Sequence, residues 1–137
     1  LSCNSFVELE RPISSAPALN IVDLHSNNIQ GELPSQILEG RQYLDFSSNK
    51  FTSIDSGSDL SSVMFLSLAK NDIHGSIPTS LCNATNLEVL DLEVNHFKGT
   101  IPYCLIAATP NLRVLNAKRN NLRGIIPNKF GKTCMFQ

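Results

Sequence analysis

Long hydrophobic runs and excess charge are both missing from this 137-residue sequence. No run of roughly 18 apolar residues occurs, so the sequence predicts no transmembrane helix. Charged residues make up 17% of the chain, their signs are interspersed and the net charge is −1, which gives no indication of a nucleic-acid or anionic-membrane partner. There is no glycine-rich phosphate loop, no kinase signature and no paired C-x-x-C motif, so nothing points to nucleotide or zinc chemistry.

The sequence is organised instead as a repeat. Residues 87–102 read L-x-x-L-x-L-x-x-N-x-F-x-G-x-I-P, and imperfect copies fill the remaining chain. The period of 22 to 25 residues, with this spacing of leucine and asparagine, is typical of the leucine-rich repeat. Aligned on their asparagines, the copies centre on Asn4, Asn27, Asn49, Asn71, Asn95 and Asn120.

Each copy predicts one short strand. The apolar residues five and three positions before the asparagine, such as Leu90 and Leu92, share one face of a strand and point into the coil. We therefore expect an α/β repeat solenoid: a leucine-rich-repeat horseshoe with a concave parallel β-sheet and short 3₁₀, helical or loop segments on its convex side. The asparagine side chains are expected to form an internal ladder, bonding backbone groups of their own turn and of the next coil.

The segment after the asparagine follows a second pattern. Four coils continue with G-x-[IL]-P, where glycine permits a tight bend and proline ends the strand. Short helical or 3₁₀ turns are expected beyond the proline, around 80–82 and 103–105. The motif is missing after Asn4 and Asn49, Arg41 replaces a usual leucine, and 54–62 is expected to be loop.

The repeat form resembles that of plant extracellular leucine-rich-repeat proteins. Several segments are similar to the C-terminal repeats of plant receptor-like proteins, including resistance receptors of the Cf and Ve type. These segments are Asp23–Asn27, Tyr43–Phe51, Gly75–Ala84 and Asn111–Asn116. The resemblance implies an extracellular horseshoe with a single transmembrane anchor, which recognises pathogen- or development-derived ligands and signals through partner receptor kinases. It implies a location on the outer side of the plasma membrane, with secretion to the apoplast as the alternative.

The domain organisation expected is one array of five to six repeats over residues 1–137. Neither end shows a polar cap, a signal peptide is not evident, and Leu1 already occupies an interior repeat position. We expect a fragment of a longer protein, and the next strand to begin near its last residues.

Exposed residues of the concave strands are the candidate binding site. Variable side chains on a rigid sheet are how solenoids recognise partners, although ordinary solvated strand residues would look the same. The ligand expected is a protein, peptide or glycan, and the candidates are Asp23, His25, Tyr43, Asp45, Phe65, Lys70, Val89, Asp91, Glu93, Asn116, Lys118 and Arg119.

Cysteines and a sequon suggest a secreted environment. Cys82 and Cys104 fall on the same arc of adjacent coils, within plausible disulfide range, although two buried thiols remain an alternative. Asn83 opens an N-x-[ST] glycosylation sequon on the convex side. His25 near Asp23 resembles half of a catalytic triad, but an open sheet offers no pocket. No enzymatic activity, cofactor or metal is expected.

Other functions stay open. A secreted inhibitor of the polygalacturonase-inhibitor type uses the same repeat, although its more uniform G-x-I-P repeats argue against it here. The ectodomain of a receptor kinase and a non-functional gene remnant are further alternatives.

Overall fold

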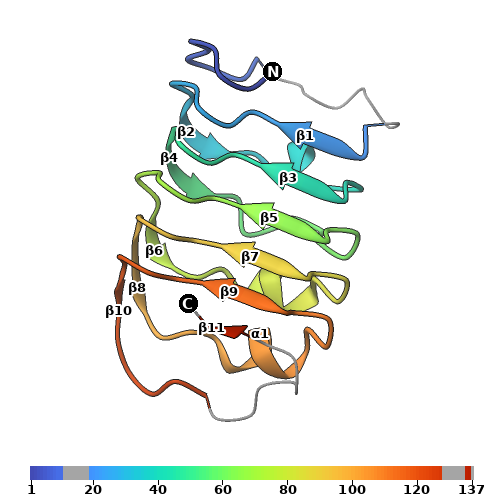
Figure 1. The fold of residues 1–137 in the computed structure, drawn as a ribbon, viewed down its shortest axis with the longest axis vertical. Coiled ribbons are helices and arrows are strands. Elements are labelled where there is room, and N and C mark those ends of the chain that lie inside the picture. The colour runs from blue at the N-terminus through green and yellow to red at the C-terminus, as the bar shows by residue number, and fades with distance from the viewer. Residues whose placement is uncertain (11–18, 128–134, 137) are drawn as a thin grey trace.

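The chain folds as a stack of coils, each of which returns to the same sheet (Figure 1). This computed structural model describes residues 1–10, 19–127 and 135–136. All pairings in the main sheet are parallel and run between successive coils, which confirms the predicted concave sheet. Its strands, in spatial order, are β1 (Ile21–Asp23), β3 (Tyr43–Asp45), β5 (Phe65–Ser67), β7 (Val89–Asp91), β9 (Val114–Asn116) and β11 (Met135–Phe136).

A second row of short parallel strands, which the sequence did not predict, follows the asparagines. Its pairs are staggered: Gln30 pairs with Lys50 and His74 with His96, so the third residue after one asparagine meets the first residue after the next. In the concave sheet, by contrast, equal offsets pair. The row comprises two small sheets, one of β2 (Gln30–Leu33) and β4 (Lys50–Ile54), the other of β6 (His74–Ser76), β8 (His96–Gly99) and β10 (Asn121–Leu122).

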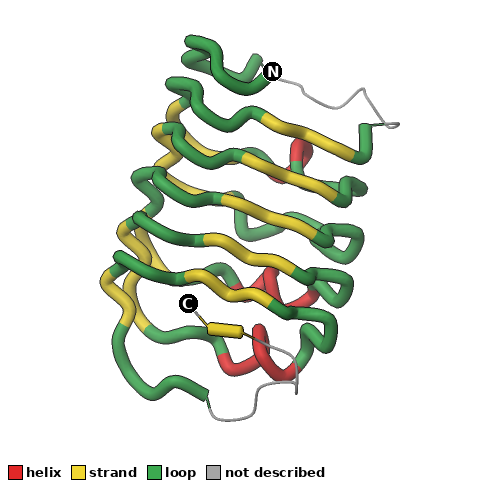
Figure 2. The backbone as a smooth tube through the Cα atoms, in the orientation of Figure 1, coloured by secondary structure: helices red, strands yellow, loops and turns green. Residues whose placement is uncertain are grey.

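Short helical turns cover the convex side where the sequence predicted them (Figure 2). They are η1 (Ser35–Ile37), η2 (Thr79–Asn83) and α1 (Tyr103–Ala107), and each follows a proline of the G-x-[IL]-P motif. The coil of Asn49, which lacks this motif, has turns and loop from Asp55 to Met64. This confirms the expected loop except at Ile54, which is the last residue of β4. At Gly124, φ is +98° and an added Cβ would lie 2.8 Å from Thr100 Cγ2, so only glycine fits this bend.

Leucine and phenylalanine side chains fill the inside of the coils. Leu44, Leu66 and Leu90, one from each successive strand, are almost completely buried, and Phe46 meets Phe51 edge to face with ring centroids 6.0 Å apart. Such burial is worth about 1.5–3 kcal/mol per side chain. Arg41, in place of the usual leucine, is buried because its guanidinium donates to the carbonyls of Gln36 and Glu39 and closes the η1 turn.

The predicted asparagine ladder is present. Asn71 Nδ2 donates to the carbonyls of Leu68 in its own coil and Phe46 in the preceding coil, and its Oδ1 accepts from the Phe51 backbone N–H. Equivalent bonds recur at Asn27, Asn49, Asn95 and Asn120. The expectation of a bond to the next coil was wrong in direction, because each asparagine reaches back to the preceding one.

Left-handed backbone precedes every one of these asparagines. The residue just before each has φ between 54° and 56°, and none is glycine. This places the asparagine amide under its own turn. The six residues are Cys3, Ser26, Ser48, Lys70, Val94 and Arg119. The β-branched Val94 is the most strained of them, because branching at Cβ disfavours this region.

Candidate functional site

The concave surface, meaning the outward side of β1, β3, β5, β7 and β9 with the second and third residues after each strand, is the candidate site. Its first row is apolar and partly open: Ile21 is 63% exposed and Tyr43 38%. The Tyr43 and Phe65 rings stack face to face, with centroids 4.3 Å apart and planes 5° apart. The stack exists because the two residues are register partners in adjacent strands. Val89 continues the row and is half-buried.

Aspartates form the second row, and each has a structural task that sequence reasoning missed. The Oδ1 atoms of Asp23, Asp45 and Asp91 accept from the backbone N–H two residues later, at 3.1, 2.9 and 2.9 Å. Aspartate favours such local turns. Asn116 takes the same role toward Lys118 and is only 8% exposed. Its inclusion among the exposed candidates was therefore wrong: it turns the chain rather than facing solvent.

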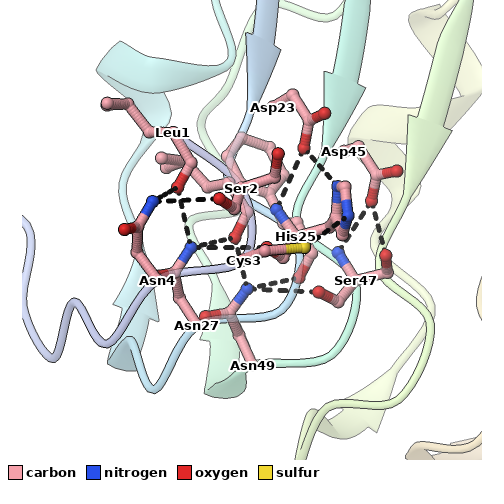
Figure 3. Close-up of polar contacts among 12 residues, drawn as sticks. Leu1, Ser2, Cys3, Asn4, Asp23, His25, Asn27, Asp45, Ser47 and Asn49 are labelled. Carbon is pink, nitrogen blue, oxygen red and sulfur yellow. Dashed lines mark hydrogen bonds and ion pairs between the residues drawn. The ribbon is translucent and has the colours of Figure 1, made fainter.

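A linked group of polar side chains lies at the first two coils (Figure 3). His25 Nδ1 is 2.6 Å from Asp23 Oδ1, and Cys3 Sγ is 3.5 Å from His25 Nε2. Burial raises the pKa of Asp23, but hydrogen bonds from the His25 backbone and ring and the attraction of nearby positive charge outweigh it, so the pKa is lowered below 3.8. The pKa of Tyr43 is raised by burial and by the carboxylates of Asp45 and Asp23.

The same group could be considered for a metal ion. Asp23, His25 and Asp45 each place one ligand-type atom within 4.8 Å of the other two. However, Asp23 Oδ1 already accepts from His25, and Asp45 Oδ1 accepts from the Ser47 backbone and hydroxyl. These bonds account for the cluster without an ion, so we assign no metal to it.

Basic residues occupy the other end of the concave surface. Lys118 and Arg119 are exposed in the last described coil, and Lys70 is exposed two coils earlier. Glu93 accepts a hydrogen bond from Asn116 Nδ2 at 3.2 Å, which directs this carboxylate toward the neighbouring strand. The surface thus carries carboxylates in the β1, β3 and β7 coils and cations in the β5 and β9 coils, so charges of both signs lie along it.

One further pair became visible only in three dimensions. His74 and His96, which stand at different repeat offsets, are register partners with stacked rings 4.8 Å apart. The disulfide that the sequence predicted between Cys82 and Cys104 joins η2 to α1, with a Cα–Cα distance of 5.4 Å. The stagger of the second strand row is the signal that would have paired the histidines.

Sequence comparisons agree with this architecture. The profile of the Leucine Rich Repeat family matches residues 86–107 and 111–133. Receptor-like protein 35 from Arabidopsis thaliana is 36% identical over an alignment of 119 residues that covers 80% of this chain. Receptor-like protein 6 from the same plant is 36% identical over 155 residues, covering 93% of this chain. The chain belongs to the leucine-rich-repeat proteins of the plant receptor-like type. It spans only 13% and 15% of the length of these two relatives.

Solved structures of plant leucine-rich-repeat receptors superpose on this chain. The leucine-rich-repeat ectodomain of the Arabidopsis thaliana membrane receptor kinase GASSHO1/SCHENGEN3, in complex with CASPARIAN STRIP INTEGRITY FACTOR 2, superposes with a TM-score of 0.80 at 28% identity. The match covers 88% of this chain and 15% of the GASSHO1/SCHENGEN3 chain. The plant peptide hormone receptor RGFR1 in complex with RGF2 has a TM-score of 0.74 at 27% identity, covering 84% and 19%. No helix in the described ranges is long and apolar enough to cross a bilayer.

Proposed function

We propose that this chain recognises an extracellular protein, peptide or glycan ligand through its concave surface, and that a partner receptor kinase carries the signal. The observation that carries the proposal is the open Tyr43–Phe65 stack on that surface. Two aromatic rings held at 4.3 Å, with the exposed Ile21 beside them, form an apolar platform. Such rings supply much of the energy at binding sites and lose little conformational entropy on contact.

The charges around the platform favour selective recognition. Asp23 and Asp45 flank the aromatic stack on the next row, and Lys118 and Arg119 lie at the far end of the sheet. Charges of both signs at fixed places on one surface fix the orientation of a bound chain more than its affinity. The parallel sheet and the asparagine ladder hold these side chains in fixed register, so little ordering is needed on binding.

The location proposed is the outer side of the plasma membrane, through an anchor outside these residues. The relatives are receptor-like proteins, and the GASSHO1/SCHENGEN3 and RGFR1 ectodomains are in complex with named partners. We propose that Asn83 carries a glycan: it is exposed at the end of η2, on the side opposite the concave sheet. A glycan there would leave ligand access free. We propose no catalytic role.

The test uses the full-length receptor that contains these repeats, expressed in plant cells. A double variant, Tyr43→Ala with Phe65→Ala, should abolish the oxidative burst triggered by elicitor-containing extracellular fluid. The matched control is Tyr103→Ala, because Tyr103 is 59% exposed but lies on the convex helix α1. Equal amounts of each receptor must reach the cell surface. An unchanged response of the double variant, or loss of response in the control, would refute concave recognition.

A further inference from the structure

We propose that Cys3 is a reactive thiol that forms mixed disulfides with disulfide-bearing molecules, with His25 as its base and Asp23 as the residue that positions His25. This goes beyond ligand recognition and does not depend on it. Cys3 Sγ lies 3.5 Å from His25 Nε2, and His25 Nδ1 lies 2.6 Å from Asp23 Oδ1. Thiol, imidazole and carboxylate therefore form one line of hydrogen-bonded groups (Figure 3).

The carboxylate of Asp23 determines which ring nitrogen of His25 carries a hydrogen. An ionised carboxylate can only accept, so Asp23 requires that His25 Nδ1 carry a hydrogen. In the neutral ring, Nε2 is then an acceptor and faces the sulfur of Cys3. A nucleophile beside a base that a third group orients is the arrangement that activates cysteine.

The backbone fixes this geometry from both sides. Cys3 has φ of 55°, and its backbone N–H donates to the His25 carbonyl at 2.9 Å. The His25 backbone N–H is in turn held by Asp23 Oδ1 at 3.1 Å. Cys3 is exposed. At the equivalent positions that have a coil on both sides, Ser26 and Lys70 are exposed, while Ser48 and Val94 are half-buried, so this position of the repeat is at least partly open to solvent within the stack.

The reaction is a balanced exchange. Cys3 transfers its thiol proton to His25 Nε2, and the sulfur attacks one sulfur of the incoming disulfide. One S–S bond breaks as another forms, and the leaving thiolate takes the proton from Nε2. The products are protein–S–S–R and R–SH, so no further oxidant is needed.

The chain contains a matched control. Ser26 occupies the same place one coil later, with φ of 54° and a 2.9 Å bond from its N–H to the carbonyl of the next coil. That carbonyl belongs to Ser47, so the hydroxyl of Ser47 stands where His25 provides an imidazole for Cys3. The variant Cys3→Ser with Ser26→Cys therefore moves the thiol by one coil, keeps its backbone and removes only its base.

The experiment measures the rate of mixed-disulfide formation with the neutral probe bis(2-hydroxyethyl) disulfide by mass spectrometry. All proteins carry Cys134→Ser, and circular dichroism checks that each is folded. At pH 6 we expect Cys3 to react about tenfold faster than the thiol in the moved position. His25→Gln should lower the rate to the control level. Asp23→Asn should lower it less and shift the pH profile to higher pH, an effect that a merely structural role would not produce.

Equal rates and equal pH profiles for the native and moved thiols would overturn the proposal, as would a His25→Gln variant that reacts like the native chain. Two equally fast thiols would trace the reactivity to the whole concave surface instead of to His25, and would also overturn it. None of these outcomes bears on ligand recognition, which the Tyr43 and Phe65 variants test separately.

Discussion

Replacing Val94 by asparagine should stabilise the protein, although the change puts a polar residue where an apolar one is half-buried. Val94 has φ of 54°. This region costs an L-residue about 1–2 kcal/mol, and asparagine tolerates it. The partly buried valine side chain contributes about 0.5 kcal/mol that would be lost. The free energy of unfolding should therefore rise by about 1 kcal/mol, which corresponds to roughly 4 °C in Tm.

Three companion variants separate strain from other causes. Val94→Thr keeps the branched Cβ and should leave stability nearly unchanged. Val94→Gly should gain only about 0.5 kcal/mol, because glycine also loses more backbone entropy on folding. Val89→Asn is the matched control: Val89 lies in β7 of the same coil, is also half-buried and has strand conformation. There the change should cost about 1 kcal/mol through lost packing and strand preference.

Urea unfolding followed by circular dichroism measures all four variants. The slope with denaturant must stay constant, so that a shift in midpoint reports stability alone. If Val94→Asn destabilises the protein as much as Val89→Asn does, the left-handed strain at Val94 is negligible and the reasoning fails.

Four other changes test the fold and its chemistry. Asn71→Leu should destabilise the protein by about 2 kcal/mol, since it leaves the buried Phe51 N–H unpaired and removes one of the two amides that donate to the Phe46 carbonyl. The control Asn28→Ala, at an exposed site, should change the free energy of unfolding by less than about 0.5 kcal/mol. Peptide mapping without reductant should find Cys82 linked to Cys104, and Cys82→Ser with Cys104→Ser should cost about 3 kcal/mol in thermal or urea unfolding, given their separation of 22 residues; two free thiols would contradict this. Secreted protein from plant cells should carry a glycan mass that Asn83→Gln removes; an unmodified Asn83 would refute it. Because the folded-state pKa of Asp23 is lowered, its stabilisation is present above about pH 4 and is lost as the pH falls through that lowered pKa. Asp23→Asn should therefore flatten the acid limb of a stability–pH curve, and an identical limb would count against the His25 contact.

The period of the sequence predicted the concave sheet, the convex turns and the asparagine ladder because each depends on residues at equal repeat offsets. Leu44, Leu66 and Leu90 stack on one another for this reason. The same comparison could not find His74 beside His96, or Cys3 beside His25, because these contacts join unequal offsets. The second strand row has a stagger of two residues, and a left-handed turn precedes each asparagine. Both features bring together residues that an alignment of equal repeat positions keeps apart.

Candidate binding residues were harder to judge from sequence. From the sequence, an aspartate on the solvent side of a strand is expected to be available for a ligand. In the structure, Asp45 and Asp91 each use one oxygen to hold the turn that follows. Asn116 was misjudged for the same reason. The aromatic stack of Tyr43 and Phe65, by contrast, follows directly from the register, because both residues stand six positions before their asparagines.

The backward reach of each asparagine has a consequence for how such a chain changes over generations. Asn49, Asn71 and Asn95 make the same set of bonds to the coil before them, so the asparagine ladder is alike at these three seams. Removing or duplicating one whole period in this stretch by unequal recombination would join two coils whose asparagine bonds already match. We therefore expect arrays of this kind to gain or lose coils, and with them rows of the concave surface, without disrupting the ladder.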